Sequence, residues 1–557
     1  MNTLSIILVL LAGVVATHWA SRALGGRIAL PLLQVAAGAA IGMTTGFGVR
    51  LEPELFFLLF LPPLLFLDGW RVPKRALQDN AATILSLAFG LVFFTVLGLG
   101  LLLHILLPAT PLGVCFALAA VLSPTDVVAA TSITTGSRIP PRLLGVLEGE
   151  ALFNDASGLV CLRLAVTATM TGAFSPGPAL AGLAWGACGG IALGIALSFA
   201  ISAVKRQVAR RIGEDTSSQI LISLLTPYGA YLLADAAGTS AVLAAVAAGM
   251  TMSWIEVGGE TLAVTRIRRN AVWETLQFAL NGSIFLLLGE QLPDILRAVH
   301  AGAAESGHQG GPAALGWLAL YTLVLLLALA AFRFGWVWVS AMIWLRRHPA
   351  APDGRRLPEW RLVSALSVAG VRGAVTLAGA LSLPLFLPDG APFPSRDLVI
   401  CLAAGVILLS LAIANLALPR LLAGIRLPPA PAREAQEIAA RIAATKAAIA
   451  ALDKAREKGG VDLDTYVLVA GQYEHRLAQL QPPTPDAATA GKATSTDASP
   501  APAIPHGEEK LHIAALRAER GAIVSLTRGR RLSTDLAHKL LREIDFAETA
   551  FEAAKQG

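Results

Sequence analysis

Three carboxylates and an amide interrupt one of the apolar segments of this chain. The stretch "EGEALFNDASGLV" (residues 148–160) places Glu148, Glu150, Asn154 and Asp155 inside an apolar run from residue 143 to residue 170. Such a run is long enough to cross the hydrocarbon core of a bilayer, where each ionised side chain costs about 2.5–3.5 kcal/mol on insertion scales. A charge in that position is therefore expected to have a partner or a task, such as holding a mobile cation or a proton.

Further charged side chains lie within other apolar runs. They are Asp68 in "LPPLLFLDGW", Asp126 in "SPTDVVAATS", Arg163, Arg333 in "LAAFRFGWVW" and Arg372 in "VAGVRGAVTLAG". With a helical rise of 1.5 Å per residue, Asp126, Glu150, Asp155 and the last two arginines fall about 10–18 Å from one face of the membrane. These groups are therefore expected to share one layer.

Helical geometry separates the tasks of the polar residues in the 143–170 run. At 100° per residue, Asn154 lies about 40° from Glu150, whereas Asp155 lies about 140° from Glu150. Glu150 and Asp155 should therefore face different neighbours. One carboxylate can be tied to an arginine while the other stays free for an ion.

Composition indicates a polytopic membrane protein that positions these residues on helices. Of the 557 residues, 55% are apolar and only 15% are charged, and the mean hydropathy is +0.63. A soluble protein of this length is far less hydrophobic. Marking apolar runs of spanning length predicts thirteen transmembrane helices between residues 5 and 422.

The loop charges predict the orientation of these spans. Alternate loops hold nineteen Lys and Arg residues, whereas the opposite set holds Arg50, Arg297 and Arg396. Because cytoplasmic loops collect basic residues, we expect the N-terminus outside and the C-terminus in the cytoplasm of a cell (inner) membrane protein. The same loops account for the net charge of +6, so nucleic-acid binding is not expected.

Two of the predicted spans should be broken. Pro124 interrupts the fifth span beside Thr125 and Asp126, and Gly370 and Gly373 flank Arg372 in the twelfth. Proline removes a backbone donor, and a broken helix exposes carbonyl groups that are able to bind a cation. Spans 2 to 6 and 9 to 13 would form two five-helix repeats of inverted topology, with the breaks in corresponding positions.

The C-terminal quarter has a different composition. Residues 427–480 are rich in Ala, Glu, Lys and Arg and predict a cytosolic helical region. Residues 481–509 are a Pro, Ala and Ser linker with too little apolar surface to fold, and residues 510–557 predict a last helical segment. We expect this tail to bind a regulatory ligand or protein, while residues 1–426 form the transmembrane domain.

The motifs "SPTDVVA", "EGEALFND", "LAAFRFGWVW" and "VRGAVTLAG", in this order, resemble those of the sodium/proton exchangers of the cation:proton antiporter-1 family. The resemblance covers roughly residues 5–425. It implies a homodimer in which a core domain with crossed, unwound helices moves against a dimerisation domain. It also implies a secondary transporter of monovalent cations and protons, with no cofactor and no enzymatic activity.

The resemblance also assigns roles to residues. Asn154 and Asp155 match the "ND" signature whose aspartate carries the ion or proton, Thr125 and Asp126 match the unwound crossing, and Glu150 matches a partner near the site. Arg333, Arg372 and Asp68 match charged residues that form structural salt bridges, and we pair Glu150 with Arg333 and Asp68 with Arg372. Two departures are Ala151, where relatives commonly have serine, and Val127, where proline or alanine is usual.

These residues lead to a mechanism with open alternatives. A single carboxylate can hold either a proton or a monovalent cation, so Na⁺ (or Li⁺) and H⁺ would compete for Asp155 in electroneutral one-for-one exchange. The expected ligands of Na⁺ are oxygen atoms of Asp155 and Thr125 and waters. A K⁺/H⁺ antiporter is the nearest alternative, and the missing serine keeps it open. A cation channel would need a continuous polar pore. A membrane enzyme would need a cluster of metal ligands or a nucleophile in its loops.

Overall fold

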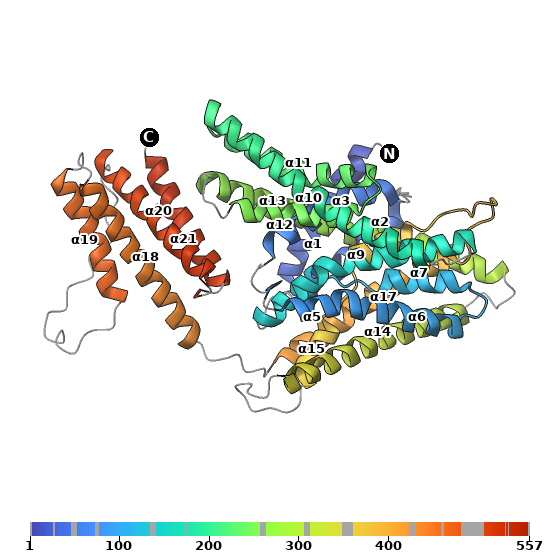
Figure 1. The fold of residues 1–557 in the computed structure, drawn as a ribbon. Helices are drawn as coiled ribbons and strands as arrows, with labels where there is room; N and C mark the ends of the chain where they lie inside the picture. Colours follow the sequence, from blue (N-terminus) through green and yellow to red (C-terminus); the bar gives the residue numbers. More distant parts are fainter. Residues whose placement is uncertain are drawn as a thin grey trace. The chain divides into compact units, whose positions relative to one another are not determined.

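In the computed structural model, the regular elements of the described residues are helices, apart from an isolated β-bridge between Phe386 and Pro392 (Figure 1). The described residues are 3–25, 28–45, 53–72, 77–78, 80–133, 141–172, 176–256, 263–305, 312–347, 360–423, 431–457, 462–480, 506–529, 531–532 and 534–554. Clustering of contacts divides the chain into two units. The first contains residues 1–255 and 272–426, and the second contains residues 256–271 and 427–557.

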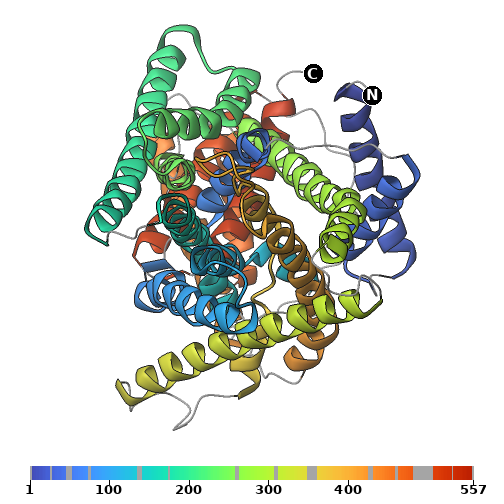
Figure 2. The same ribbon diagram turned by 90° about the vertical axis from the view of Figure 1, so that its right-hand side faces the viewer.

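The first unit is a bundle of apolar helices. Its elements are α1 (Thr3–Ala23), α2 (Leu30–Thr45), α3 (Pro53–Arg71), α5 (Ala81–Leu85), the π-helix η1 (Ser86–Leu91), α6 (Val92–Leu106), α7 (Leu112–Leu122), α8 (Val127–Ile133), α9 (Pro141–Thr171), α10 (Pro176–Ile212), α11 (Thr216–Ala236), α12 (Ala241–Glu256), α13 (Ala263–Glu305), α14 (Pro312–Arg347), α15 (Trp360–Val368), α16 (Ala374–Leu381) and α17 (Arg396–Leu422). Helices α6, α7 and α9 lie side by side in Figure 1, and α14 runs obliquely along the bundle in Figure 2.

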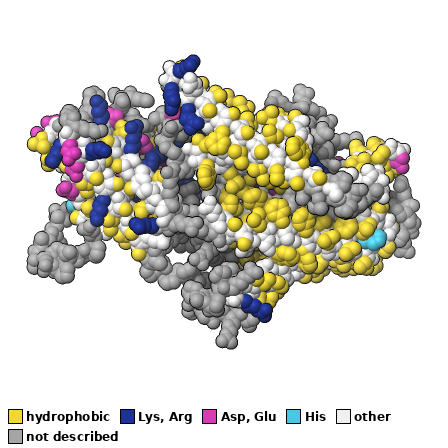
Figure 3. Space-filling view, viewed as in Figure 1, with side chains coloured by type: hydrophobic (Ala, Val, Ile, Leu, Met, Phe, Trp, Pro, Cys, Tyr) yellow, Lys and Arg dark blue, Asp and Glu magenta, His cyan; other side chains and the backbone are white. Residues whose placement is uncertain are grey.

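The surface of this unit is suited to lipid. Among the described residues, seven helices are long and apolar enough to cross a membrane, and three shorter helices are also apolar. Large apolar side chains on α6, α10 and α14 point outward, including Leu97, Phe199 and Leu327. Figure 3 shows apolar side chains covering much of the visible face. The protein is therefore a multi-pass membrane protein, while the count of thirteen spans and the inverted repeats remain predictions.

The two expected helix breaks are present. Residues 123–126 separate α7 from α8 after Leu122, and residues 369–373 separate α15 from α16. Pro124 lies in the first break, where its missing N–H cannot continue α7. Gly370 and Gly373 lie in the second, where the chain passes close to other groups. Both interruptions therefore arise where local backbone chemistry opposes a continuous helix.

Small residues allow the helix backbones of the first unit to approach closely. A Cβ atom added to Gly38 of α2 would lie 2.0 Å from the backbone oxygen of Leu286 in α13, and one added to Gly289 would lie 2.0 Å from that of Val35. The same holds for α12 and α3, where a Cβ on Gly249 would lie 2.0 Å from the oxygen of Phe66. Such contacts are typical of helix packing in membranes, where van der Waals complementarity drives association.

The second unit is a helical bundle built mainly from the tail. It contains α18 (Pro431–Glu457), α19 (Leu463–Leu480), α20 (His506–Arg528) and α21 (Thr534–Ala554), and α18 packs on both α19 and α20. The last helical segment begins at His506, four residues before the predicted position, and contains two helices. Residues 481–505, most of the predicted linker, lie outside the described residues.

Gly38→Ala is expected to destabilise the bundle, because its new methyl group meets a backbone oxygen that cannot move aside. Overpacking of this kind costs about 1–3 kcal/mol. Gly335→Ala on α14 is the matched control, since nothing lies within 4 Å of its added Cβ and alanine favours the helix by up to about 1 kcal/mol. Thermal unfolding in detergent should show a lower Tm for Gly38→Ala alone. Equal melting of the two variants would contradict the close approach of α2 and α13.

Candidate ion-binding site

The two helix breaks are hydrogen-bonded to each other. The backbone N–H of Asp126 donates to the carbonyl oxygen of Val371 at 2.7 Å. The Asp126 carboxylate accepts a hydrogen bond from the N–H of Ala129 at 3.0 Å and so caps the start of α8. An acidic group at a helix N-terminus satisfies a free N–H and interacts favourably with the helix dipole.

Arg372 satisfies the carbonyl groups that the breaks leave open. Its Nε donates to the oxygen of Leu122, at the end of α7, at 2.6 Å, and its Nη1 donates to the oxygen of Gly370. Its backbone N–H donates to Ser410 Oγ at 3.2 Å. A guanidinium placed at two helix C-termini offsets their partial negative charge.

The predicted pairing of Asp68 with Arg372 is therefore wrong. Arg372 is only 4% exposed, and its side-chain donors bind backbone oxygen atoms. An unsatisfied carbonyl group in an apolar interior carries a large free-energy cost, which favours this arrangement. Asp68 instead lines a cavity together with Thr125, Asp126 and Asp155.

A second arginine forms the ion pair expected from the sequence. Arg333 binds Glu150 through both guanidinium ends, with Nη2 at 2.6 Å from Oε2, and the two side chains are 3% and 2% exposed. Arg333 Nε also donates to the oxygen of Leu366 at 2.9 Å, next to the end of α15. The predicted pairing of Glu150 with Arg333 is thus confirmed, and its charges are satisfied internally.

Thr125 and Asn154 extend this pair into a network. Asn154 Nδ2 donates to Thr125 Oγ1 at 2.8 Å, and Thr125 Oγ1 donates to Glu150 Oε1 at 3.3 Å. The Thr125 hydroxyl, predicted as an ion ligand, is thus engaged with two protein groups. Asn154 is buried, and its Oδ1 has no hydrogen-bond partner among the described residues. It is an acceptor still available to a water or an ion.

Asp155 faces away from this network, as the helical angle predicted. It lines the cavity and makes no hydrogen bond or ion pair with any residue that the structure describes. Two further carboxylates, Asp126 and Asp68, line the same cavity. A carboxylate surrounded by like charges and open to a cavity is suited to a cation or a proton.

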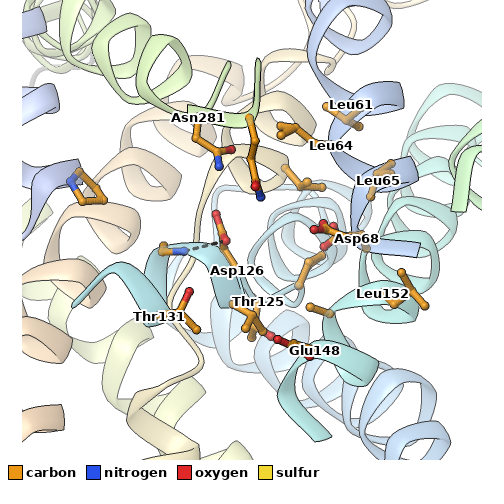
Figure 4. Close-up of a pocket in the computed structure, with 18 of the residues that line it drawn as sticks. Leu61, Leu64, Leu65, Asp68, Thr125, Asp126, Thr131, Glu148, Leu152 and Asn281 are labelled. Carbon is orange, nitrogen blue, oxygen red and sulfur yellow. Dashed lines mark hydrogen bonds between the residues drawn. The ribbon is translucent and has the colours of Figure 1, made fainter. Parts of the chain in front are cut away.

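The cavity has a volume of about 520 Å³ and lies between α2, α3, α8, α9 and α13. Figure 4 shows Asp68, Thr125, Asp126, Thr131 and Glu148 around this space, with Asn281 on the opposite wall. Gln34 and Gln277 also line it, and Arg71 donates to Gln277 Oε1 at 2.6 Å. The volume exceeds that of one cation and leaves room for waters that complete its coordination.

Helix α13 forms a wall of the cavity that was not predicted from the sequence. Glu274, Gln277 and Asn281 line the cavity. Their i, i+3, i+7 spacing puts these three polar side chains on one helical face, a signal that could have found them. Arg163, another charged residue of this apolar run, is exposed on α9.

The back of α9 is held by irregular structure. Ser157 Oγ donates to the carbonyl oxygen of Ala88 at 2.6 Å, and Ala88 lies in the π-helix η1. A π-helix leaves carbonyl groups outside the usual bonding pattern and often marks functional sites. A Cβ atom added to Gly158, also on α9, would lie 2.4 Å from Pro124 Cγ. The first helix break therefore packs closely against the helix that carries Asp155.

Crossed, broken helices beside a free carboxylate in a cavity define a membrane ion transporter. Comparison with known proteins specifies which kind. The profile described as "Sodium/hydrogen exchanger, transmembrane" matches residues 6–424. The chain belongs to this family of membrane cation/proton exchangers, which are transporters rather than enzymes.

Individual relatives agree with that assignment. An uncharacterised Na⁺/H⁺ exchanger of Escherichia coli, YjcE, is 38% identical over 97% of this chain and 96% of its own length. A sodium, potassium, lithium and rubidium/H⁺ antiporter of Bacillus pumilus is 41% identical over 74% of this chain and 60% of its own. The structure of the sodium proton antiporter MjNhaP1 of Methanocaldococcus jannaschii matches 76% of this chain and 99% of that one, with a TM-score of 0.57 at 18% identity.

Gly373→Ala is expected to impair ion exchange by displacing Asp126. A Cβ at Gly373 would lie 1.9 Å from Asp126 Oδ2, so the carboxylate or the second break must shift. Misplacement of a site by about 1 Å can cost roughly 100-fold in rate. In the control Gly379→Ala, in α16, which follows the break, the nearest atom to the added Cβ is Val121 Cγ2 at 3.3 Å. Transport by purified protein in liposomes should fall for Gly373→Ala and persist for Gly379→Ala; equal activities would contradict the contact.

Proposed function

We propose that this protein exchanges Na⁺ for H⁺ across the cell membrane, with both ions competing for Asp155. The observation that carries the proposal is that Asp155 lines a polar cavity and makes no hydrogen bond or ion pair within the described part of the chain. Two other acids of the crossing are engaged by the protein, since Glu150 binds Arg333 and Asp126 caps α8. Asp155 of α9 thus keeps its carboxylate available for cargo, with Asp68 of α3 lining the same cavity.

The competing ions are bound by oxygen atoms. Na⁺ is held by Asp155, by oxygen atoms of Thr125 and by waters in the cavity, because hard cations prefer such ligands. The Asn154 Oδ1 and the carboxylates of Asp68 and Asp126 supply further negative potential or water contacts. Glu150, Arg333 and Arg372 hold the crossing in place and do not carry the ion.

Competition at one group explains a one-for-one exchange. An empty carboxylate carries an uncompensated charge through the low-dielectric interior, whereas a carboxylate loaded with Na⁺ or H⁺ is neutral. The loaded forms therefore cross and the empty form does not. Because the two loaded forms have equal charge, exchange is electroneutral and follows the ion gradients. Such exchange supports pH and sodium homeostasis.

The transport cycle follows from the family arrangement. A homodimer places one block of helices as a fixed frame, and the block with the crossed helices moves Asp155 between two faces of the membrane. The basic loops put the N-terminus outside and the C-terminus in the cytoplasm. The cavity rim that carries Arg71, Glu148 and Glu274 then faces the cytoplasm.

A K⁺/H⁺ antiporter is the second candidate, and two observations favour keeping it. Ala151 lines the cavity where relatives commonly offer a serine hydroxyl, so one ligand for a small cation is missing. The Bacillus pumilus relative is named for four alkali cations. Proton flux in liposomes driven in turn by Na⁺, K⁺, Li⁺ and Rb⁺ separates the candidates.

Asp155→Asn is expected to abolish exchange while leaving a folded, membrane-inserted protein, because the amide cannot bind a proton or balance a cation. Cation-driven proton flux in liposomes measures the loss. Asp235→Asn, an exposed aspartate on α11, removes the same charge and should exchange normally. Ordinary transport by Asp155→Asn would remove this residue from its proposed role.

Acidification is expected to raise the apparent KM for the cation, because protons and cations compete for one group. A drop of one pH unit should raise that KM by up to about tenfold where the protonated form dominates, with little change in the maximal rate. An imposed membrane voltage should leave the rate unchanged. A KM independent of pH, or a rate that follows voltage, would contradict electroneutral competition.

A further inference from the structure

Helix α13 (Ala263–Glu305) belongs to both units of the molecule. Residues 256–271 cluster with the tail, whereas residues 272–426 cluster with the membrane bundle. The helix is continuous across this boundary. The sequence offered no sign of this, since the basic cluster Arg266, Arg268 and Arg269 is explained by loop charge alone.

Four charged side chains join the first turns of α13 to the tail. Arg266 Nη2 lies 2.7 Å from Asp545 Oδ1, its Nε donates to Asp545 Oδ2 at 3.3 Å, and it lies 3.6 Å from Glu548. Arg520 of α20 binds the same two acids of α21, with Nη2 at 2.7 Å from Glu548. We call these four residues the α13 clamp.

The α13 clamp is protected from solvent. Its side chains are between 9% and 16% exposed, and the neighbouring Thr265 and Arg269 are 0% and 3% exposed. Exposed ion pairs contribute little because water and salt screen them, whereas a buried group of two arginines and two acids holds its geometry once formed. The contact is therefore specific, because each of the two arginines lies next to both acids.

The same helix then forms a wall of the ion cavity. Glu274, Gln277 and Asn281 line it, and they follow Arg266 by 8 to 15 residues, or about 12–22 Å along the axis. Trp273 donates to Ser223 at 3.2 Å, and Gln277 accepts from Arg71 at 2.6 Å. Helix α13 is thus held by the tail at its first turns and lines the cavity with polar side chains further along. A small displacement of its first turns is therefore transmitted to the cavity wall.

We propose that the tail sets the cation affinity of the exchanger through the α13 clamp, with Arg266 as a positioning residue for the cavity wall. The inference rests on the proposed exchange function and deepens it. Arg266 does not line the cavity. Any effect of its substitution on ion binding must therefore be transmitted along α13, and a regulator that displaces α20 or α21 would act by the same route.

The experiment measures cation-driven proton flux by the full chain in liposomes, as KM and maximal rate over a pH series. The alkali cation is whichever drives the unsubstituted protein. The variants are Arg266→Asp, Asp545→Arg and the pair combined. The control is Arg297→Gln, which removes a charge from the other end of α13, where Arg297 and Asp294 are 69% and 58% exposed.

Each single reversal is expected to change KM at least about fivefold, a coupling at the lower end of typical allosteric effects, while the maximal rate changes less. The combined reversal should restore the original KM and pH profile, and Arg297→Gln should leave both unchanged. Restoration separates coupling from a general loss of folding, because two independently damaging substitutions would not correct each other.

Three results would overturn the proposal: unchanged KM in both single variants, a change that the combined reversal does not restore, or loss of transport in all three variants. Failure of the proposed function is recognised separately. In that case the unsubstituted chain shows no cation-driven flux, or Asp155→Asn retains it, before any clamp variant is compared.

Discussion

Backbone polar groups inside a membrane must be satisfied by the protein itself, and this requirement organises the centre of the molecule. Two helices stop and restart in the apolar interior, which leaves free carbonyl and N–H groups with no water to bind. One positively charged and one negatively charged side chain bind these free backbone groups. Arg372 binds carbonyl oxygens at the end of α7 and in the second break, and Asp126 caps α8 while its backbone binds Val371.

With the backbone groups of the two helix breaks satisfied, the polar and charged side chains of α9 form two sets. Glu150 and Asn154 face Arg333 and Thr125, so one side of the helix is a closed hydrogen-bonded network. Asp155 faces the cavity on the other side. A rotation of about 140° between two acids on one helix thus separates structural charge from charge that is available to an ion. Close contacts at Gly158 and Gly373 keep the breaks near both sets.

The tail is part of this architecture rather than an appendage of unrelated origin. The family profile ends at residue 424, but the Escherichia coli relative aligns over 97% of the chain. The tail bundle is therefore compatible with a shared full-length design. Its ion cluster on the first turns of α13 gives it a physical connection to a helix that lines the cavity.

Local chemistry in the sequence by itself determined the membrane class, the two helix breaks and the separation of Glu150 from Asp155. Hydrophobicity, proline and glycine backbone effects and the helical repeat act over a few residues, so they can be read without neighbours. The tertiary structure alone decided which groups Arg372 binds, that Asp68 and Asn281 face the cavity, and that α13 joins the tail. These outcomes depend on which of several competing partners comes within about 3 Å, and that distance is set by packing between helices far apart in the chain.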